Sequence, residues 1–152
     1  MAELLRGAGW IVRIEVSYAI YGERGSIDLL VWHEATQTLL VIEVKTDVVS
    51  VEETLRKHDE KARLAGRIAA EQFAWRPRAV GRLLVLPGLV TPRRRVERHA
   101  SVLEVAYPAR GVAIRAWLRQ PTGPMSGILF LQPAGGRQLE GVGRRRIRRQ
   151  AA

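Results

Sequence analysis

The 152-residue sequence contains no cysteine and only three histidines. The absence of cysteine excludes disulfides, thiolate zinc sites, iron–sulfur clusters and a cysteine nucleophile. The three histidines, His33, His58 and His99, show no metal-ligand spacing, so we expect each of them at the surface. No serine lies in a nucleophile elbow, and no run of glycines forms a phosphate-binding loop. The sequence therefore gives no indication of chemistry based on these groups.

Long hydrophobic runs are also missing. The longest stretch without a charged residue, 120–136, is interrupted by three prolines and four glycines. The N-terminus lacks the basic and apolar segments of a signal peptide. We therefore expect a cytoplasmic protein without a membrane partner. The hydrophobic share of 47% and the charged share of 26% are those of an ordinary globular domain with one core.

Acidic residues are scarce in the second half of the chain. Residues 1–76 include 10 basic and 12 acidic residues, whereas residues 77–152 include 15 basic and 3 acidic ones, a net charge of +12. A basic region of this size attracts phosphate backbones, so the composition favours a nucleic-acid partner. Arginine outnumbers lysine 22 to 3, and a biased base composition of the source genome is a simpler explanation for part of this excess.

The first part of the chain shows strand periodicity. After a short helix that ends before Gly9, alternating apolar residues predict a strand over 10–16, and glycines predict a loop over 17–25. Apolar runs at 26–32 and 38–45, joined by a polar turn, predict an antiparallel hairpin. The second run is apolar on both faces, which places it centrally in the sheet.

The rest of the chain alternates helices and strands. Ser50 and Glu53 form a capping box that predicts a helix to about residue 72. The pattern after it predicts a strand over 82–86, a helix over 91–105, a strand over 111–118, an edge strand over 127–131 and a disordered basic tail over 135–152. The predicted fold class is therefore α/β, a mixed β-sheet flanked by helices in the order (α)βββαβαβ.

Three charged residues interrupt the apolar hairpin: Asp28, Glu43 and Lys45. Because side chains alternate along a strand, Glu43 and Lys45 share one face. Asp28 lies near the start of the neighbouring antiparallel strand, beside the end of the Glu43 strand, so the two carboxylates can converge. Such charges are costly in a buried hairpin unless they pair or bind a cation. Oxygen ligands without histidine or cysteine suit Mg²⁺ or Mn²⁺.

This pattern resembles the PD-(D/E)XK nuclease superfamily, the restriction-endonuclease-like fold, and within it the Holliday-junction-resolvase-like branch. The matching features are Asp28, the strand with Glu43, Val44 and Lys45, and the capped helix that follows it. Residues 15–28 are also similar to nuclease-like domains that follow a helix-turn-helix segment. The resemblance covers roughly residues 8 to 90 and implies a restriction-endonuclease-like domain over residues 1–134.

The resemblance implies a mechanism as well as a fold. Asp28, Glu43 and the main-chain carbonyl of Val44 would bind the metal ion, while Lys45 would position the attacking water and stabilise the hydroxide that forms. The metal would lower the pKa of that water and neutralise charge developing on the phosphate. Phosphodiester bonds of DNA would thus be hydrolysed in line. Relatives of this kind are often homodimers.

The superfamily usually supplies one more acid from the helix before the first strand. The only acid on that helix here is Glu3, and its spacing to Trp10 is shorter than expected. Glu3 could take this role, the helix could begin earlier in a longer protein, or the metal site could have fewer carboxylates.

Further residues are candidate contacts for nucleic acid. Tyrosines and an arginine of the 17–25 loop could stack on bases or bind phosphate, although tyrosines more often pack within turns. A lysine on the capped helix could face the site. Arginines that open a later helix oppose its dipole, a conflict that an anion would relieve. These candidates are Tyr18, Tyr21, Arg24, Lys61, Arg93, Arg94, Arg95 and Arg98, with Arg144, Arg145, Arg146, Arg148 and Arg149 in the tail.

Two functions from different classes are consistent with these features. The first is a DNA endonuclease dependent on Mg²⁺ or Mn²⁺ and centred on Asp28, Glu43 and Lys45. The second is a catalytically inactive nuclease-like module that binds DNA or regulates another process. The intact Asp…Glu-x-Lys pattern favours the first, and the short first helix favours the second. A scaffold unrelated to nucleic acid would leave the basic second half unexplained.

Overall fold

A computed structural model describes residues 1–132 of the chain. The predicted basic tail with its five arginines lies outside the described residues. No helix within residues 1–132 is both long and apolar enough to cross a membrane. The elements, in chain order, are α1 (Ala2–Gly7), β1 (Trp10–Ile20), β2 (Glu23–His33), β3 (Thr38–Val44), α2 (Val51–Phe73), β4 (Ala79–Pro87), α3 (Val90–Arg98), α4 (Ala100–Ala106), α5 (Gly111–Arg119) and β5 (Ser126–Leu131).

The five strands form one mixed sheet in the order β1-β2-β3-β4-β5. β1, β2 and β3 are antiparallel neighbours, whereas β3, β4 and β5 run parallel. Parallel neighbours need a crossover, which α2 provides between β3 and β4, and α3, α4 and α5 provide between β4 and β5. The α/β class and the central position of β3 are therefore confirmed, with β5 as the edge strand that the sequence predicts.

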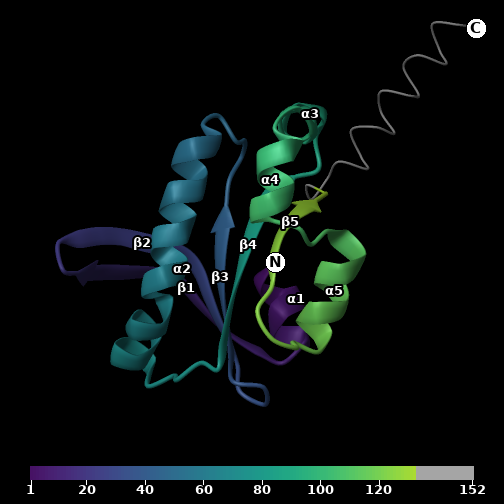
Figure 1. Ribbon diagram of the computed structural model, residues 1–152. Helices are drawn as coiled ribbons and strands as arrows, with labels where there is room; N and C mark the ends of the chain where they lie inside the picture. Colours follow the sequence, from purple (N-terminus) through teal and green to yellow (C-terminus); the bar gives the residue numbers. More distant parts are fainter. Residues whose placement is uncertain (133–152) are drawn as a thin grey trace, which may run out of the picture.

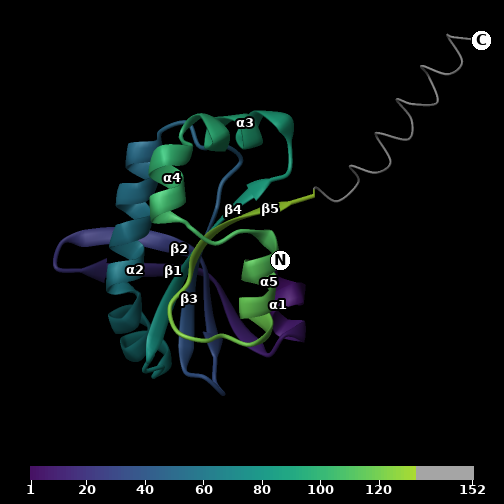
Figure 2. The same ribbon diagram turned by 45° about the vertical axis from the view of Figure 1, so that its right-hand side comes forward.

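Helices cover both faces of the sheet (Figures 1 and 2). One face packs against α2 through Leu39 and Val41, and against α3 and α4 through Leu84. The other face packs against α1 and α5, where Leu40 and Ile42 meet side chains of both helices. Because β3 is buried from both sides, its continuous apolar run is explained. We call the face that packs against α2, α3 and α4 the α2 face.

Two predicted elements beyond β4 are wrong. Residues 111–118 form the helix α5, in which Ile114, Trp117 and Leu118 are buried at helical spacing. Val112 is 87% exposed, so the period-two alternation in this segment has no structural role. The predicted helix over 91–105 is two helices, α3 and α4, which meet at His99.

The predicted loop over 17–25 is also wrong, because both strands of the first hairpin continue through it. β1 and β2 pair from Trp10 with His33 to Ile20 with Glu23. Tyr21 and Gly22 alone form the turn, with φ values of 49° and 82°. Two successive residues with positive φ are typical of a type I′ turn, which matches the twist of paired strands. The hairpin thus projects as a long arm beside α2 (Figure 1).

The prediction that all three histidines lie at the surface is wrong for His58, which is 1% exposed. Its Nε2 lies 3.1 Å from the carbonyl oxygen of Val41 and its Nδ1 lies 2.6 Å from the hydroxyl of Tyr107. A carbonyl only accepts, so Nε2 donates, and Nδ1 of the neutral ring accepts from the tyrosine. Burial lowers the pKa of His58 from 6.5 to about 4. The ring is therefore a neutral hydrogen-bonding link between α2, β3 and the end of α4.

Candidate metal centre

Asp28 and Glu43 lie directly opposite each other on neighbouring strands. The register pairs Leu29 with Ile42 across β2 and β3, and continuing it by one residue sets Asp28 opposite Glu43. Side chains of opposed residues in an antiparallel pair project from the same face. The carboxylate of Asp28 also accepts a hydrogen bond of 2.8 Å from the main-chain nitrogen of Val44. The structure thus brings both predicted carboxylates together at the end of β3.

Glu43 is buried on the α2 face, where it forms an ion pair with α2. The residue is 4% exposed, and its Oε1 lies 2.9 Å from Nζ of Lys61. Oε1 receives no well-aligned hydrogen bond from the described part of the chain. Burial raises the pKa of Glu43, the ammonium of Lys61 opposes this shift, and the carboxylate of Asp28 adds to it. Positive charge in addition to that of Lys61 would therefore stabilise the two carboxylates together.

Lys45 lies just beyond the end of β3 and is partly buried. Its main-chain nitrogen donates to the carbonyl of Val85 at 3.0 Å, which extends the parallel ladder by one bond. The hydrogen bond from Lys57, and more weakly the charge of Lys45, lower the pKa of Glu53 in the first turn of α2. Among residues 1–132, no ion pair joins the Lys45 side chain to Asp28 or Glu43. The ammonium that contacts the buried carboxylate belongs to Lys61.

Tyr18 is not a surface residue available to nucleic acid. It is 6% exposed, and its hydroxyl donates a 2.7 Å hydrogen bond to Glu60 of α2. Gly25 is its cross-strand partner, and a Cβ on Gly25 would lie only 2.6 Å from the Tyr18 hydroxyl. The missing side chain at Gly25 is thus what allows the tyrosine ring to lie across β2. Tyr18 therefore joins the hairpin to α2 and does not offer its ring for the predicted contact with a base.

The other two candidates of the hairpin are exposed. Tyr21 in the turn is 86% exposed, and the guanidinium of Arg67 lies 4.4 Å from the centre of its ring. Arg24 lies on β2 next to the turn and is exposed as well. Both remain accessible for contact with a polyanion, from strand and turn positions instead of the predicted loop.

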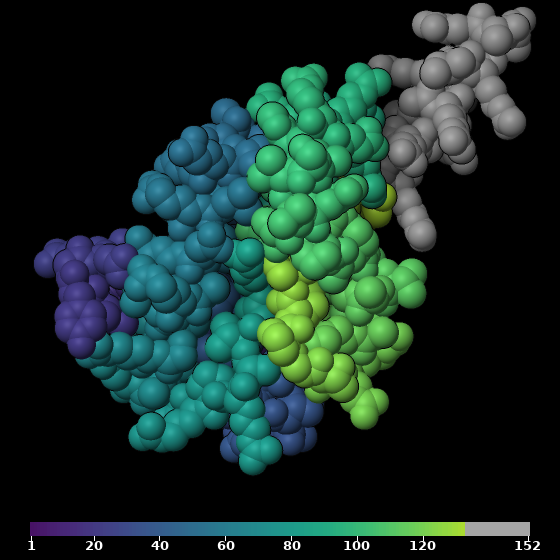
Figure 3. Space-filling model, viewed as in Figure 1, coloured from purple at the N-terminus to yellow at the C-terminus, as the bar shows by residue number. Residues whose placement is uncertain are grey.

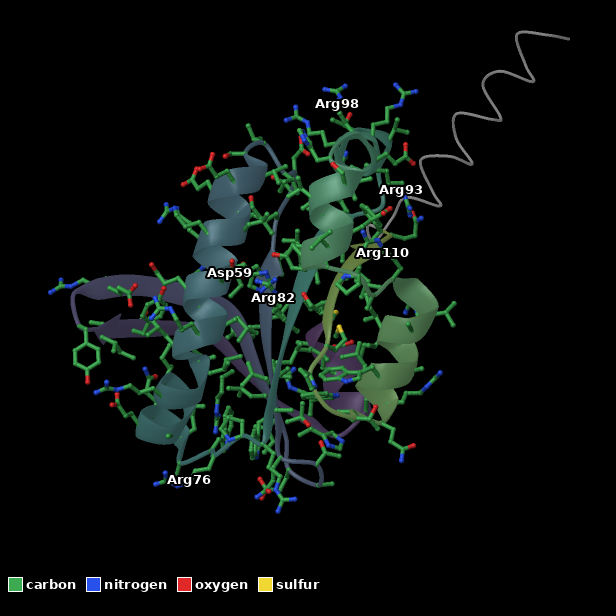
Figure 4. All side chains as sticks on the ribbon, in the orientation of Figure 1. Asp59, Arg76, Arg82, Arg93, Arg98 and Arg110 are labelled. Carbon is green, nitrogen blue, oxygen red and sulfur yellow. The ribbon has the colours of Figure 1, made fainter. Side chains whose placement is uncertain are left out.

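The first arginine cluster divides into bound and free members. Arg95 forms a 3.0 Å ion pair with Asp47, and the guanidinium of Arg93 lies 4.5 Å from the ring centre of Phe130. Arg94 and Arg98 are exposed, and neither forms an ion pair with another described residue. Figure 4 shows Arg98 directed away from the rest of the molecule at the end of α3. Arg93 is exposed as well, so three of the four arginines are without an ion pair among the described residues and open to an anionic partner.

Glu3 lies far from the carboxylate pair in the architecture. It is an exposed residue of α1, a helix that packs on the face opposite to α2. Glu15, by contrast, lies level with Asp28, because the flanking pairs are Ile14 with Leu29 and Val16 with Ile27. The structure thus excludes Glu3 from the site as described and places a different acid on the adjacent strand.

Glu15 also marks a change of face along β1. Before it, Trp10 packs with α1 and α5, while after it Val16 and Tyr18 pack with α2, although all three positions are even-numbered. A strand with period two cannot change faces without a local rotation. Glu15 supplies it with a φ of 51°, a left-handed conformation that costs a residue with a side chain about 1–2 kcal/mol. The outer half of the hairpin is thereby turned onto α2, with Asp28 opposite the point of rotation.

A cleft of about 390 Å³ opens on the α2 face, between α2 and the segment before β5 (Figure 3). Arg82 lines it, and its guanidinium forms an ion pair with Asp59 (Figure 4) and donates to Ser126 and to the carbonyl of Ala106. With all three nitrogens of its guanidinium engaged, Arg82 joins α2, β4 and β5. The cleft offers no free charge from this residue.

The carboxylate pair fits a hard divalent cation. Mg²⁺ is commonly held by one or two carboxylates, with water and substrate phosphate as further ligands. Asp28 and Glu43 supply two adjacent carboxylates, and the buried Oε1 of Glu43 lacks an aligned hydrogen bond although the Lys61 ammonium lies 2.9 Å from it. Within residues 1–132 no group of three Asp, Glu, His or Cys side chains is arranged around one point. The donor set therefore suits a cation that shares its coordination with a bound phosphate.

Comparisons of the chain with models of protein families, with curated proteins and with solved structures found no match. The comparisons thus neither support nor oppose the resemblance to PD-(D/E)XK nucleases that the sequence motif suggests.

Proposed function

We propose that the chain is a divalent-metal-dependent DNA endonuclease of the PD-(D/E)XK type. The observation that supports this most directly is the pairing of Asp28 with Glu43 on one face at the end of β3. Two adjacent carboxylates that are partly desolvated repel each other, and Mg²⁺ or Mn²⁺ would remove this repulsion. The exposed arginines of α3 and the net charge of +12 in residues 77–152 supply attraction for a polyanion.

Each group of the site has a definite task in this proposal. Asp28 and Glu43 hold the cation, together with the main-chain carbonyl of Val44 that the resemblance indicates. The hydrogen bond from the Val44 nitrogen keeps the Asp28 carboxylate fixed beside Glu43. The bound cation would lower the pKa of the attacking water and offset the charge that develops on the phosphate. By the resemblance, Lys45 positions the attacking water and stabilises the hydroxide that forms.

One observation favours the second candidate, a DNA-binding or regulatory module without catalysis. Glu43 already has a cationic partner in Lys61, at 2.9 Å, and Glu3 lies on the opposite face of the fold. An internal ammonium can satisfy a buried carboxylate permanently. In that case the fold would keep its DNA-binding surface and the cation would have no place.

Cleavage assays separate the two functions. The full chain is incubated with duplex, branched and single-stranded DNA in the presence of Mg²⁺, Mn²⁺ or EDTA. We expect metal-dependent cleavage of at least one substrate and a loss of at least about 100-fold in rate in Asp28→Asn, because one cation ligand is removed. Binding of DNA without cleavage in any metal would favour the regulatory module.

The variant Asp28→Asn is a matched test of the site. Its amide oxygen can still accept the hydrogen bond from the Val44 nitrogen, so the strand end keeps its geometry while the charge is lost. Lys57→Gln serves as the control, because Lys57 pairs with Glu53 at the exposed side of α2. Cleavage that persists at the native rate in Asp28→Asn would refute the assignment of the site.

A further inference from the structure

The position of Lys61 is unusual for a lysine on the surface helix of an α/β protein. Its side chain is 14% exposed and its ammonium lies 2.9 Å from a carboxylate that is itself 5% exposed. Lys57, one turn earlier on α2, is 51% exposed and pairs with Glu53. The two lysines on the same helix thus differ sharply: one pairs with a neighbour on its own helix, and the other enters the carboxylate pair.

We infer that Lys61 is the ammonium of this site: it neutralises Glu43 in the cation-free protein and binds the DNA phosphate once a divalent cation is bound by Asp28 and Glu43. This inference depends on the proposed function and gives Lys61 a phosphate contact beside the cation, a task different from the positioning of water that the resemblance gives to Lys45. It adds a residue of α2 to the active site, and it makes the number of phosphate contacts depend on the cation.

The geometry supports Lys61 over Lys45. Lys61 touches the buried carboxylate directly, whereas Lys45 lies past the end of β3 and forms no ion pair with Asp28 or Glu43 within residues 1–132. A lysine that acts beside the cation must reach a phosphate bound there. Nζ of Lys61 lies 2.9 Å from Oε1 of Glu43, and the flexible four-carbon stem of the lysine allows the ammonium to move a few ångströms without moving the helix.

Charge balance explains why Lys61 would leave Glu43. In the cation-free site, the two carboxylates carry two negative charges against the single positive charge of Lys61. A divalent cation neutralises both carboxylates, and Lys61 then has like charge beside it and no remaining partner. The DNA phosphate is the anion that restores its balance. Binding of the cation therefore makes one more phosphate contact available.

The salt dependence of DNA binding measures this contact. Each lysine that neutralises a phosphate of duplex DNA steepens the slope of log K against log [salt] by about 0.9. Binding is measured with the full chain in EDTA and in Ca²⁺, under conditions where no cleavage product forms. In Ca²⁺ we expect the native chain to show a slope steeper by about 0.9 than that of Lys61→Gln. In EDTA the two slopes should coincide, because Glu43 holds Lys61.

Three further variants sharpen the result. Lys61→Arg should keep the native slope in Ca²⁺, and Lys57→Gln should match the native chain in both conditions. Glu43→Gln releases Lys61 without any cation, so its slope in EDTA should exceed the native slope by about 0.9. This last variant tests the inference even if Lys61→Gln folds poorly.

The possible failures are distinguishable. Equal slopes for native chain and Lys61→Gln in Ca²⁺ would overturn the inference alone, as would a loss of slope in Lys45→Gln in its place. If Ca²⁺ has no effect on DNA binding by the native chain, the cation has no role in the site. That result would overturn the proposed function and the inference together.

Discussion

The two buried titratable residues beside β3 are compensated by different means. Glu43 is balanced by the ammonium of Lys61, whereas His58 is balanced by two hydrogen bonds and carries no charge. A buried charge depends on a partner of opposite sign, while a neutral ring depends on one donor and one acceptor. Charge changes at these two residues should therefore affect different properties: the proposed binding of metal and DNA for Glu43, and stability in acid for His58.

His58 gives a prediction for the pH dependence of stability. Burial lowers its pKa to about 4 in the folded chain, against 6.5 when it is exposed. Between these values the unfolded chain binds more protons than the folded one, so the free energy of unfolding falls as the pH is lowered from 6.5 to 4. The difference amounts to about 3 kcal/mol, at 1.36 kcal/mol per pKa unit. Denaturant titrations across this range measure it.

The variant His58→Gln isolates this contribution. Glutamine can donate to the carbonyl of Val41 and accept from Tyr107, but it has no titratable group. Between pH 6.5 and 4 the free energy of unfolding of the variant should fall less steeply than that of the native chain. Above this range the two proteins should differ only by the constant cost of the substitution. Glu43 acts in the opposite direction, because its raised pKa favours proton uptake by the folded chain. Parallel curves for the two proteins would contradict the assignment of His58 as buried and neutral.

Single residues of the site could be predicted only where the strand pattern carries them. Asp28 and Glu43 break apolar runs on consecutive strands, so their meeting can be deduced from strand pairing alone. The sequence also names Lys61 as a residue of the capped helix that could face the site, and the structure places it there. Its contact with Glu43 could not be predicted, because it depends on how α2 is rotated over the sheet, a property set by packing at many positions. Tyr18 has the same difficulty: a tyrosine near two glycines is typical of a loop, and its burial depends on Gly25 being its exact cross-strand partner.

Among the helices and strands, those whose sequence pattern fits only one kind of element are the ones that the sequence predicts correctly. The start of α2 is marked by Ser50, whose hydroxyl accepts a 3.3 Å hydrogen bond from the nitrogen of Glu53, as the capping box predicts. α5 has no such marker, and its apolar residues fit both period two and helical spacing. Tertiary contacts favour the helix over the strand, among them a 2.8 Å hydrogen bond that the indole of Trp10 in β1 donates to the carbonyl of Leu118. A short ambiguous segment is thus resolved by the surface on which it packs.

The exposed arginines of α3 should contribute to DNA binding. Arg94 and Arg98 are exposed and unpaired among the described residues, whereas Arg95 is tied to Asp47. Replacing Arg94 and Arg98 with glutamine should weaken DNA binding for all sequences alike and reduce the salt slope by about 0.9 per arginine. Fluorescence anisotropy with labelled duplex DNA at several salt concentrations measures both effects.

Arg95→Gln is the matched comparison within the same helix. It removes the ion pair that joins α3 to the segment between β3 and α2, so its first effect should be on stability, by up to about 1 kcal/mol for a partly exposed pair. Its effect on the salt slope should be smaller than that of either exposed arginine. An unchanged slope in the variant without Arg94 and Arg98 would show that DNA lies on a different surface.

At the scale of the whole molecule, charge and fold divide the chain in a consistent way. Residues 1–76 hold the carboxylates and have a net charge of −2, whereas residues 77–152 have a net charge of +12. β3 lies at the boundary of the antiparallel and parallel parts of the sheet, and its end carries Glu43. The mixed topology thereby places acidic residues of one half beside arginines of the other. Two ion pairs join the halves directly, Arg82 with Asp59 and Arg95 with Asp47.

A cation that binds the folded chain must stabilise the whole molecule, which gives the last prediction. At a concentration of 100 times its Kd, a ligand specific for the folded state adds about 2.7 kcal/mol to the free energy of unfolding. For a chain of this size we expect Mn²⁺ to raise the Tm by roughly 5–10 °C. The matched control is the double variant Glu43→Gln with Lys61→Met, which removes both charges of the buried pair and leaves neither unpaired. The double variant should fold with near-native stability, and Mn²⁺ should not raise its Tm. An increase in Tm equal to that of the native chain would place the cation elsewhere. If Mn²⁺ leaves the Tm of the native chain unchanged while DNA raises it, the result would support the regulatory module.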